Sequence, residues 1–136
     1  MPGSKSDYLE TKILDHVLGG PDYTRAATVH VALFTAAPTD AGGGTEATGG
    51  AYARVAVTNN ATNFPAATGP ASTKKNGTAI TFPKATASWG TVVSWGIFDA
   101  ATAGNLLYWG NLTTSKSVGI DDTPSFAANA ITITED

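Results

Sequence analysis

Residues that could bind a metal or carry out catalysis are few in this 136-residue chain. The two histidines, His16 and His30, fall in different predicted elements, and neither lies in an HExxH or HxH pattern. Each is therefore expected to be a structural or surface histidine. The sequence contains no cysteine, which excludes disulfides and thiolate metal sites within it. We expect neither a metal nor a cofactor.

The carboxylates and glycines give no catalytic constellation either. Asp121 and Asp122 are adjacent, but calcium binding or acid–base catalysis would need further oxygen ligands or a second carboxylate at a set spacing. A plain turn is the expected structure there. The glycine run 42–44 lacks the lysine of a phosphate-binding loop and is expected to be flexible. No serine lies in a GxSxG motif. These patterns predict that the chain is not an enzyme.

The charge content excludes other classes. Charged residues make up only 14% of the chain, against the usual quarter, and the net charge is −3. Because no basic stripe is present, nucleic-acid binding is not expected. The apolar runs are too short to span a membrane, and we expect no secretory signal. A neutral, polar surface of this kind favours packing against other proteins.

One amphipathic helix is predicted near the start of the sequence. Asp7 is the expected N-cap, with Glu10 completing a capping box, and the glycines at 19–20 end the helix. Two arrangements are open: the helix lies on its own sheet, or it docks as an arm on a neighbouring subunit. The candidate assembly contacts on it are Tyr8, Leu9, Ile13 and Val17, and Leu14 and Leu18 extend the apolar stripe.

Beyond Pro21 the apolar period changes from 3.6 to 2, which predicts strands. The strand at 90–99 is apolar on both faces and should be central, forming a hairpin with 105–112. We predict a mainly β fold, an antiparallel β-sandwich of jelly-roll or immunoglobulin-like type with one N-terminal α-helix. Residues 1–20 would form the helix or arm, and residues 21–136 a single sandwich domain. The other predicted strands are 28–35, 51–58, 77–82, 116–120 and 130–134.

Two long loops and a group of aromatic residues are the remaining candidate contacts. The loops at 36–50 and 59–75 contribute Thr39, Asp40, Glu46 and Phe64. Trp89, Tyr108 and Trp109 are candidates for an aromatic ligand-binding or interface surface, with burial in the core as the other possibility. Trp89 is expected to be the most exposed tryptophan, and Trp95 could pair with Trp109 across the hairpin.

Several phrases of the sequence resemble a known family. They include VALFTAAPTDAGGGTE at 31–46, GGAYARVAVT at 49–58, FPKATASWGTVVSWGIFDA at 82–100 and NLLYWG at 105–110. From about Ser6 onward the chain resembles the small structural proteins of tailed bacteriophages that are usually labelled phage tail fibre protein. The resemblance implies a virion protein that assembles with other phage proteins. It provides no catalytic motif.

The kind of virion protein is argued from size and pattern. Long trimeric fibre shafts need repeats, and this sequence has none. We therefore predict a non-enzymatic capsid-decoration (cement) protein that stabilises the particle through contacts with major capsid or tail proteins. The alternative is a tail-fibre or tail-tip protein that takes part in host receptor or glycan binding. In either role we expect a homo-oligomer, with a trimer as one form.

Overall fold

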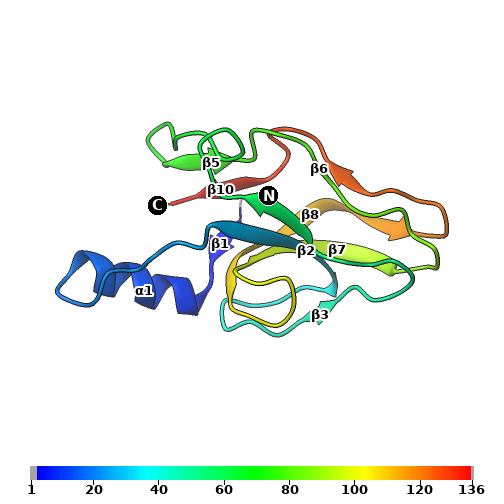
Figure 1. The fold of residues 1–136 in the computed structure, drawn as a ribbon, viewed down its shortest axis with the longest axis horizontal. Helices are drawn as coiled ribbons and strands as arrows, with labels where there is room; N and C mark the ends of the chain where they lie inside the picture. Colours follow the sequence, from blue (N-terminus) through cyan, green and yellow to red (C-terminus); the bar gives the residue numbers. More distant parts are fainter. Residues whose placement is uncertain (1–2, 136) are drawn as a thin grey trace.

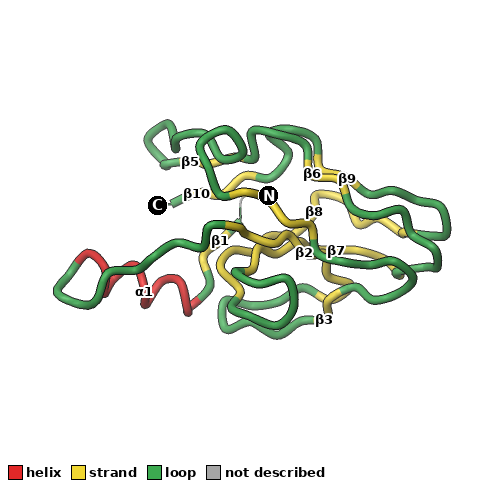
Figure 2. The backbone as a smooth tube through the Cα atoms, in the orientation of Figure 1, coloured by secondary structure: helices red, strands yellow, loops and turns green. Residues whose placement is uncertain are grey.

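A computed structural model describes residues 3–135 as an antiparallel β body with one helix at its end (Figure 1). The main sheet has six strands in the order β1-β8-β7-β2-β3, with β4 also paired to β2. Two small sheets, β5–β10 and β6–β9, complete the body (Figure 2). In chain order the elements are β1 (Ser4–Lys5), α1 (Asp7–Val17), β2 (Thr28–Ala36), β3 (Thr45–Glu46), β4 (Val55–Thr58), β5 (Thr73–Lys75), β6 (Ile80–Thr81), β7 (Gly90–Phe98), β8 (Leu106–Val118), β9 (Ser125–Phe126) and β10 (Thr132–Thr134).

The core lies between the main sheet and the two small sheets. Val31 of β2 and Trp95 of β7 point into it from the main sheet, while Ile80 of β6 and Ile131 beside β10 enter from the other layer. The predicted fold class, a mainly β antiparallel protein with one helix, is confirmed, and the layers are arranged like a sandwich. β7 is the central strand, as predicted, and it forms the expected hairpin with β8.

Several strand boundaries differ from the prediction. Residues 51–54 precede β4, because Ala51 takes a left-handed backbone with φ of 67° and Arg54 points into a polar cluster. The strands predicted at 105–112 and 116–120 are one strand, β8. Its register with β7 shifts between Val92 and Ser94, which marks a bulge in the ladder. Because a bulge breaks the alternation of side chains between the two faces, the period of 2 did not reveal that the strand is continuous. The loops expected at 36–50 and 59–75 contain β3 and β5, respectively.

The helix begins one residue earlier than predicted. Ser6, and not Asp7, is the N-cap: its hydroxyl accepts a hydrogen bond from the Leu9 backbone N–H and donates one to the Leu106 carbonyl. Ser6 can do both because it is buried against β8, whereas Asp7 is exposed. Gly19 takes a left-handed conformation directly after the helix, with φ of 80°, as its position predicted.

The two ends of the helix have different surroundings. Leu9 is 3% exposed and belongs to the core, and Ile13 packs partly against it. One turn later Leu14, Val17 and Leu18 are 63%, 67% and 74% exposed. The first half of α1 therefore packs on its own sheet, and its last turn projects from the body (Figure 1). β1, which precedes α1, pairs with β8 in the main sheet; the division of the chain at residue 20 stays a prediction.

A buried asparagine holds the second layer together. Asn76 is 1% exposed, and its amide nitrogen donates to the carbonyls of Thr78 and Ala127 at 2.9 Å each. Its Oδ1 accepts from the Ile131 backbone N–H at 2.8 Å. These bonds join the end of β5 to the segment that leads into β10. The sequence indicated only a turn at Asn76-Gly77, because the partners lie about fifty residues away.

We expect Asn76→Ala to lower the free energy of unfolding by about 3 kcal/mol, because the partly buried bonds to two carbonyls and the buried bond to one N–H would be lost. Asn59→Ala is the matched control. It removes a single bond, from the Asn59 amide to the Ala26 carbonyl, and should cost about 1 kcal/mol. Urea denaturation followed by tryptophan fluorescence measures both values. Equal losses in the two variants would contradict the role assigned to Asn76.

Candidate functional site

An apolar groove opens between α1, the main sheet and the β5–β10 sheet, with a volume of about 360 Å³. Leu9 and Ile13 line it from the helix, Tyr108 from β8, and Phe64 from the loop before β5. These four residues came from three separate groups of predicted contacts. The fold brings them together at one end of the molecule, so the groove is the main candidate for a contact site.

Charged side chains surround the groove. Arg25, Lys74 and Lys75 contribute positive charge, and Glu135 contributes a carboxylate that the Lys5 ammonium contacts at 2.7 Å. Within the groove, burial and the nearby Glu135 carboxylate raise the pKa of Tyr108 above its ordinary value. Its hydroxyl is therefore neutral at physiological pH. The groove is an apolar surface with a rim that is positive on balance.

The predicted helix stripe continues out of this groove. Ile13 lies in it, Val17 lies one turn further along the same side, and Val17 is exposed. Leu14 and Leu18 extend the exposed apolar surface around the end of the helix. We call Leu14, Val17 and Leu18 the helix end.

The first long loop uses its predicted contact residues within the chain. The Asp40 carbonyl accepts a hydrogen bond from the Asp7 backbone N–H at 2.8 Å, and its Oδ1 accepts one from the Trp109 indole at 2.9 Å. The Thr39 hydroxyl donates to the Gly42 carbonyl at 3.2 Å, which closes a tight turn. Tyr8 lines a small hollow beside Asp40, away from the apolar groove. The loop is thus fastened to the helix start and to β8, and Gly42, the first residue of the glycine run, is held in a defined turn.

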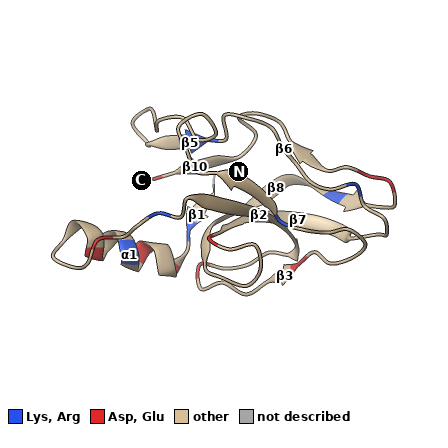
Figure 3. Cartoon of the chain, in the orientation of Figure 1, with Lys and Arg blue, Asp and Glu red and all other residues tan. Residues whose placement is uncertain are grey.

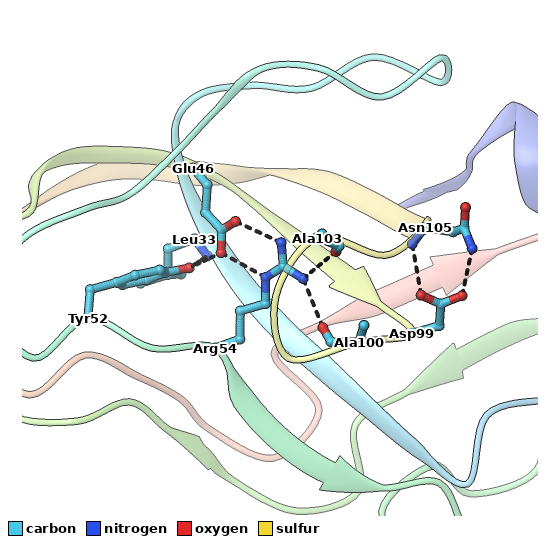
Figure 4. Close-up of polar contacts among 8 residues, drawn as sticks. All are labelled: Leu33, Glu46, Tyr52, Arg54, Asp99, Ala100, Ala103 and Asn105. Atoms are coloured by element: carbon cyan, nitrogen blue, oxygen red, sulfur yellow. Dashed lines mark hydrogen bonds and ion pairs between the residues drawn. The ribbon is translucent and has the colours of Figure 1, made fainter.

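Glu46 and Arg54 form a half-buried ion pair that fastens the same loop at its other end (Figure 4). Two nitrogens of Arg54 donate to the two carboxylate oxygens of Glu46 at 2.8 and 2.9 Å. The third nitrogen donates to the carbonyls of Ala100 and Ala103, both at 2.8 Å. The guanidinium also lies 3.7 Å from the centre of the Phe98 ring. With its side chain only 7% exposed, Arg54 joins β3, β4 and the turn of the β7–β8 hairpin.

Tyr52 completes this cluster. Its hydroxyl donates to Glu46 Oε2 at 2.7 Å and accepts from the Leu33 backbone N–H at 3.1 Å. Burial opposes ionisation of Glu46, but the hydrogen bonds from Arg54 and Tyr52 outweigh it, so the pKa of the Glu46 carboxyl is lowered. Burial and the bond to Glu46 raise the pKa of Tyr52 far above its ordinary value. Sequence reasoning named Glu46 as a loop contact but missed Tyr52 and Arg54. Both lie in the segment 51–58, which was predicted to be a strand from its alternating pattern.

The sequence left two possibilities for Trp89, Tyr108 and Trp109: an exposed aromatic surface or burial in the core. Trp89 was expected to be the most exposed tryptophan, and this is wrong: it is 3% exposed. Its indole donates to the Gly50 carbonyl at 2.8 Å, and its ring meets the Tyr52 ring edge-on at 5.2 Å. The pairing of Trp95 with Trp109 is also wrong, because Trp95 lies opposite Gly110 and Trp109 opposite Gly96. The two tryptophans therefore point to opposite faces of the sheet.

Among residues 3–135, no three His, Asp or Glu side chains lie close enough together to hold a metal ion. In the same range no helix has the length and hydrophobicity needed to cross a membrane. The apolar groove with the helix end remains the strongest candidate for a functional surface.

We expect the Glu46 cluster to make stability depend on acid pH. Because the pKa of Glu46 is lower in the folded state, its stabilisation is complete above the unfolded pKa, about 4.3. It is lost as the pH falls from there through the folded pKa. Glu46→Gln should lower the melting temperature at pH 7, and the difference from the native protein should shrink below pH 4. Melting curves from pH 2.5 to 7 measure this. The exposed Glu10 gives the control, since E10Q removes a carboxylate without touching the cluster. A constant difference for E46Q across this range would contradict the prediction.

Comparison with known families gives a match over residues 4–134, to the family described as podophage GP4 fiber I protein gp80. A comparison with curated proteins gave no match. The family match spans nearly the whole chain and includes α1, the groove and both layers of the β body. It agrees with the resemblance found in the sequence. The chain therefore belongs to the podophage fiber I protein family and is a structural component of the phage virion.

Proposed function

We propose that this chain is a non-enzymatic component of the tail fibre, which joins other virion proteins through its helical end. Support for the fibre position comes from the family description, which names a fibre protein and covers almost the whole sequence. The sequence alone favoured a capsid-decoration protein, chiefly because it contains no repeats. The family match supports the tail-fibre alternative better than that role.

The exposed helix end is the observation that carries the assembly role. Leu14, Val17 and Leu18 are all more than 60% exposed, although burial of each would be favourable by about 1.5–3 kcal/mol. Contiguous apolar side chains of this kind mark surfaces that a partner protein covers. The groove beside the helix enlarges this surface. We propose that other virion proteins, further copies of this chain included, contact the molecule here.

The β body presents this surface rigidly. Asp40, Ser6 and Leu9 fasten the base of the helix to β8 and to the core. The Glu46–Arg54 pair fastens the long loop and the hairpin turn. A contact surface that is already ordered loses less conformational entropy when a partner binds.

Host glycan binding by the fibre has less support from the structure than assembly with other virion proteins. Stacking on sugar rings requires exposed aromatic faces, and Trp89 and Trp95 are both buried. Trp109 is partly exposed, but its indole N–H is already bonded to Asp40. Protein–protein assembly is therefore the role that we propose.

Replacing Leu14, Val17 and Leu18 together with serine should reduce incorporation into phage particles more than about tenfold. Loss of even one buried contact of about 1.5–3 kcal/mol has this effect. The copy number per purified particle, measured by quantitative mass spectrometry, tests the prediction. Ile120→Ser is the matched control, because Ile120 is 65% exposed but lies far from the helix in the sequence and outside the groove. A folded triple variant that enters particles as well as I120S does would overturn the assembly role.

The fibre position has a separate test. Gold-labelled antibody against this chain should bind the tails of intact particles in electron micrographs and leave the capsid shell unlabelled. Labelling spread over the capsid would favour the decoration role instead.

A further inference from the structure

We infer that the apolar groove receives the helix end of a second copy of this chain, so that the protein associates with itself through these two surfaces. This inference rests on the proposed assembly role and adds the identity of one partner. Both surfaces belong to the same molecule. The groove has room for apolar side chains, and the helix end has apolar side chains that its own chain does not cover.

The groove has the shape and chemistry to take apolar side chains. At about 360 Å³ it lies within the size range of protein pockets that bind a ligand. Ile13, Tyr23, Phe64 and Ile133 line it and are all only partly buried by the chain's own packing. Further burial of these side chains requires an occupant from outside.

The helix end has the spacing that a groove of this kind recognises. Leu14, Val17 and Leu18 follow one another at i, i+3 and i+4, which places them on one side of the helix. Their exposure shows that no element of the same chain covers them. An amphipathic helix that lies in an apolar groove uses anchors at these intervals.

The charges around the two surfaces also favour the pairing of the helix end with the groove. Glu10 lies one turn before Leu14 on the exposed side of the helix, and Asp15 lies one turn before Leu18. The groove is flanked by Arg25, Lys74 and Lys75, while its acidic residue, Glu135, is already bound to Lys5. Figure 3 shows acidic positions on α1, with the basic position of Lys12 between them, and basic positions at β5. An acidic helix face thus meets a basic rim in a chain whose net charge is negative.

Self-association by this contact has two closed forms. If two copies exchange their helix ends, the result is a dimer with twofold symmetry. If each copy binds the next in one direction and the circle closes, the result is a ring, of which a trimer is one form. In both forms the same side chains meet, so one set of variants tests both.

Charge reversal of the purified full-length chain tests the contact. Size-exclusion chromatography with light scattering should show an oligomer for the native protein. The double variant Glu10→Lys, Asp15→Lys should weaken association more than tenfold, and so should Lys74→Glu, Lys75→Glu. Combining all four changes should restore it, because opposite charges face each other again. Circular dichroism confirms that each variant is folded. A native protein that stays monomeric at 100 μM, or a fourfold variant that does not recover, would overturn the inference.

The lack of cysteine in the sequence allows a direct proximity test. One chain carries Leu18→Cys and the other Ala67→Cys, at a residue that lines the groove. Mild oxidation of the mixture should link the two chains, whereas Ile120→Cys mixed with Ala67→Cys should not react at a comparable rate. Equal cross-linking in both mixtures would overturn the inference.

These results separate the inference from the proposed function. If the protein is a monomer but its helix-end variant still fails to enter particles, the assembly role is supported and the self-contact is contradicted. If the protein is an oligomer but the antibody labels only the capsid, the self-contact is supported and the fibre position is contradicted.

Discussion

The ion pair of Glu46 with Arg54 is the interaction on which the arrangement of the loops depends. A buried charge is costly unless its hydrogen-bonding capacity is satisfied, and here the carboxylate and the guanidinium satisfy one another and two backbone carbonyls. The pair spans three parts of the chain: β3, the start of β4 and the β7–β8 turn. Tyr52 adds the Leu33 backbone to the same cluster. These bonds hold the glycine-rich loop against the sheet. The conformational entropy of the loop is therefore lost when the chain folds, and not later when a partner binds.

Charged residues are scarce in this protein, so their placement is informative. Glu46 and Arg54 stabilise the loops, and the pair of Lys5 with Glu135 joins β1 to the residue that follows β10. Of the other charged residues, Arg25, Lys74 and Lys75 line the groove, while α1 carries the carboxylates of Asp7, Glu10 and Asp15 together with Lys12 (Figure 3). Elsewhere on the β body, the exposed Lys84 pairs with Asp121 at 3.4 Å, so these two charges offset one another. In the proposed assembly, these charges at the helical end would orient the approaching partner.

The sequence predicted α1, β2 and β7 well, divided the longest strand, β8, into two, and predicted the non-local contacts poorly. β2 and β7 are nine residues each, long enough for alternation to be recognised, and α1 is bounded by a cap and by glycine. β1 and β9 have two residues each, and no periodicity can identify a strand of that length. Trp89 was misplaced because its burial depends on Gly50 and Tyr52, about forty residues away. Phe64 and Leu9 were each selected as contacts, but only the fold shows that they line one groove.

The position of α1, half on the sheet and half in solvent, links the fold to assembly. Ser6 and Leu9 fix the base of the helix, so the direction of its free turn is set by the core and not by a flexible linker. A helix attached only by a linker would have to lose its freedom of orientation on binding, and this loss would weaken the contact. A helix packed along its whole length would leave no apolar residue for a partner. Anchoring one half makes the exposed half a rigid projection, and the groove at its base leaves room for the same projection from a second molecule.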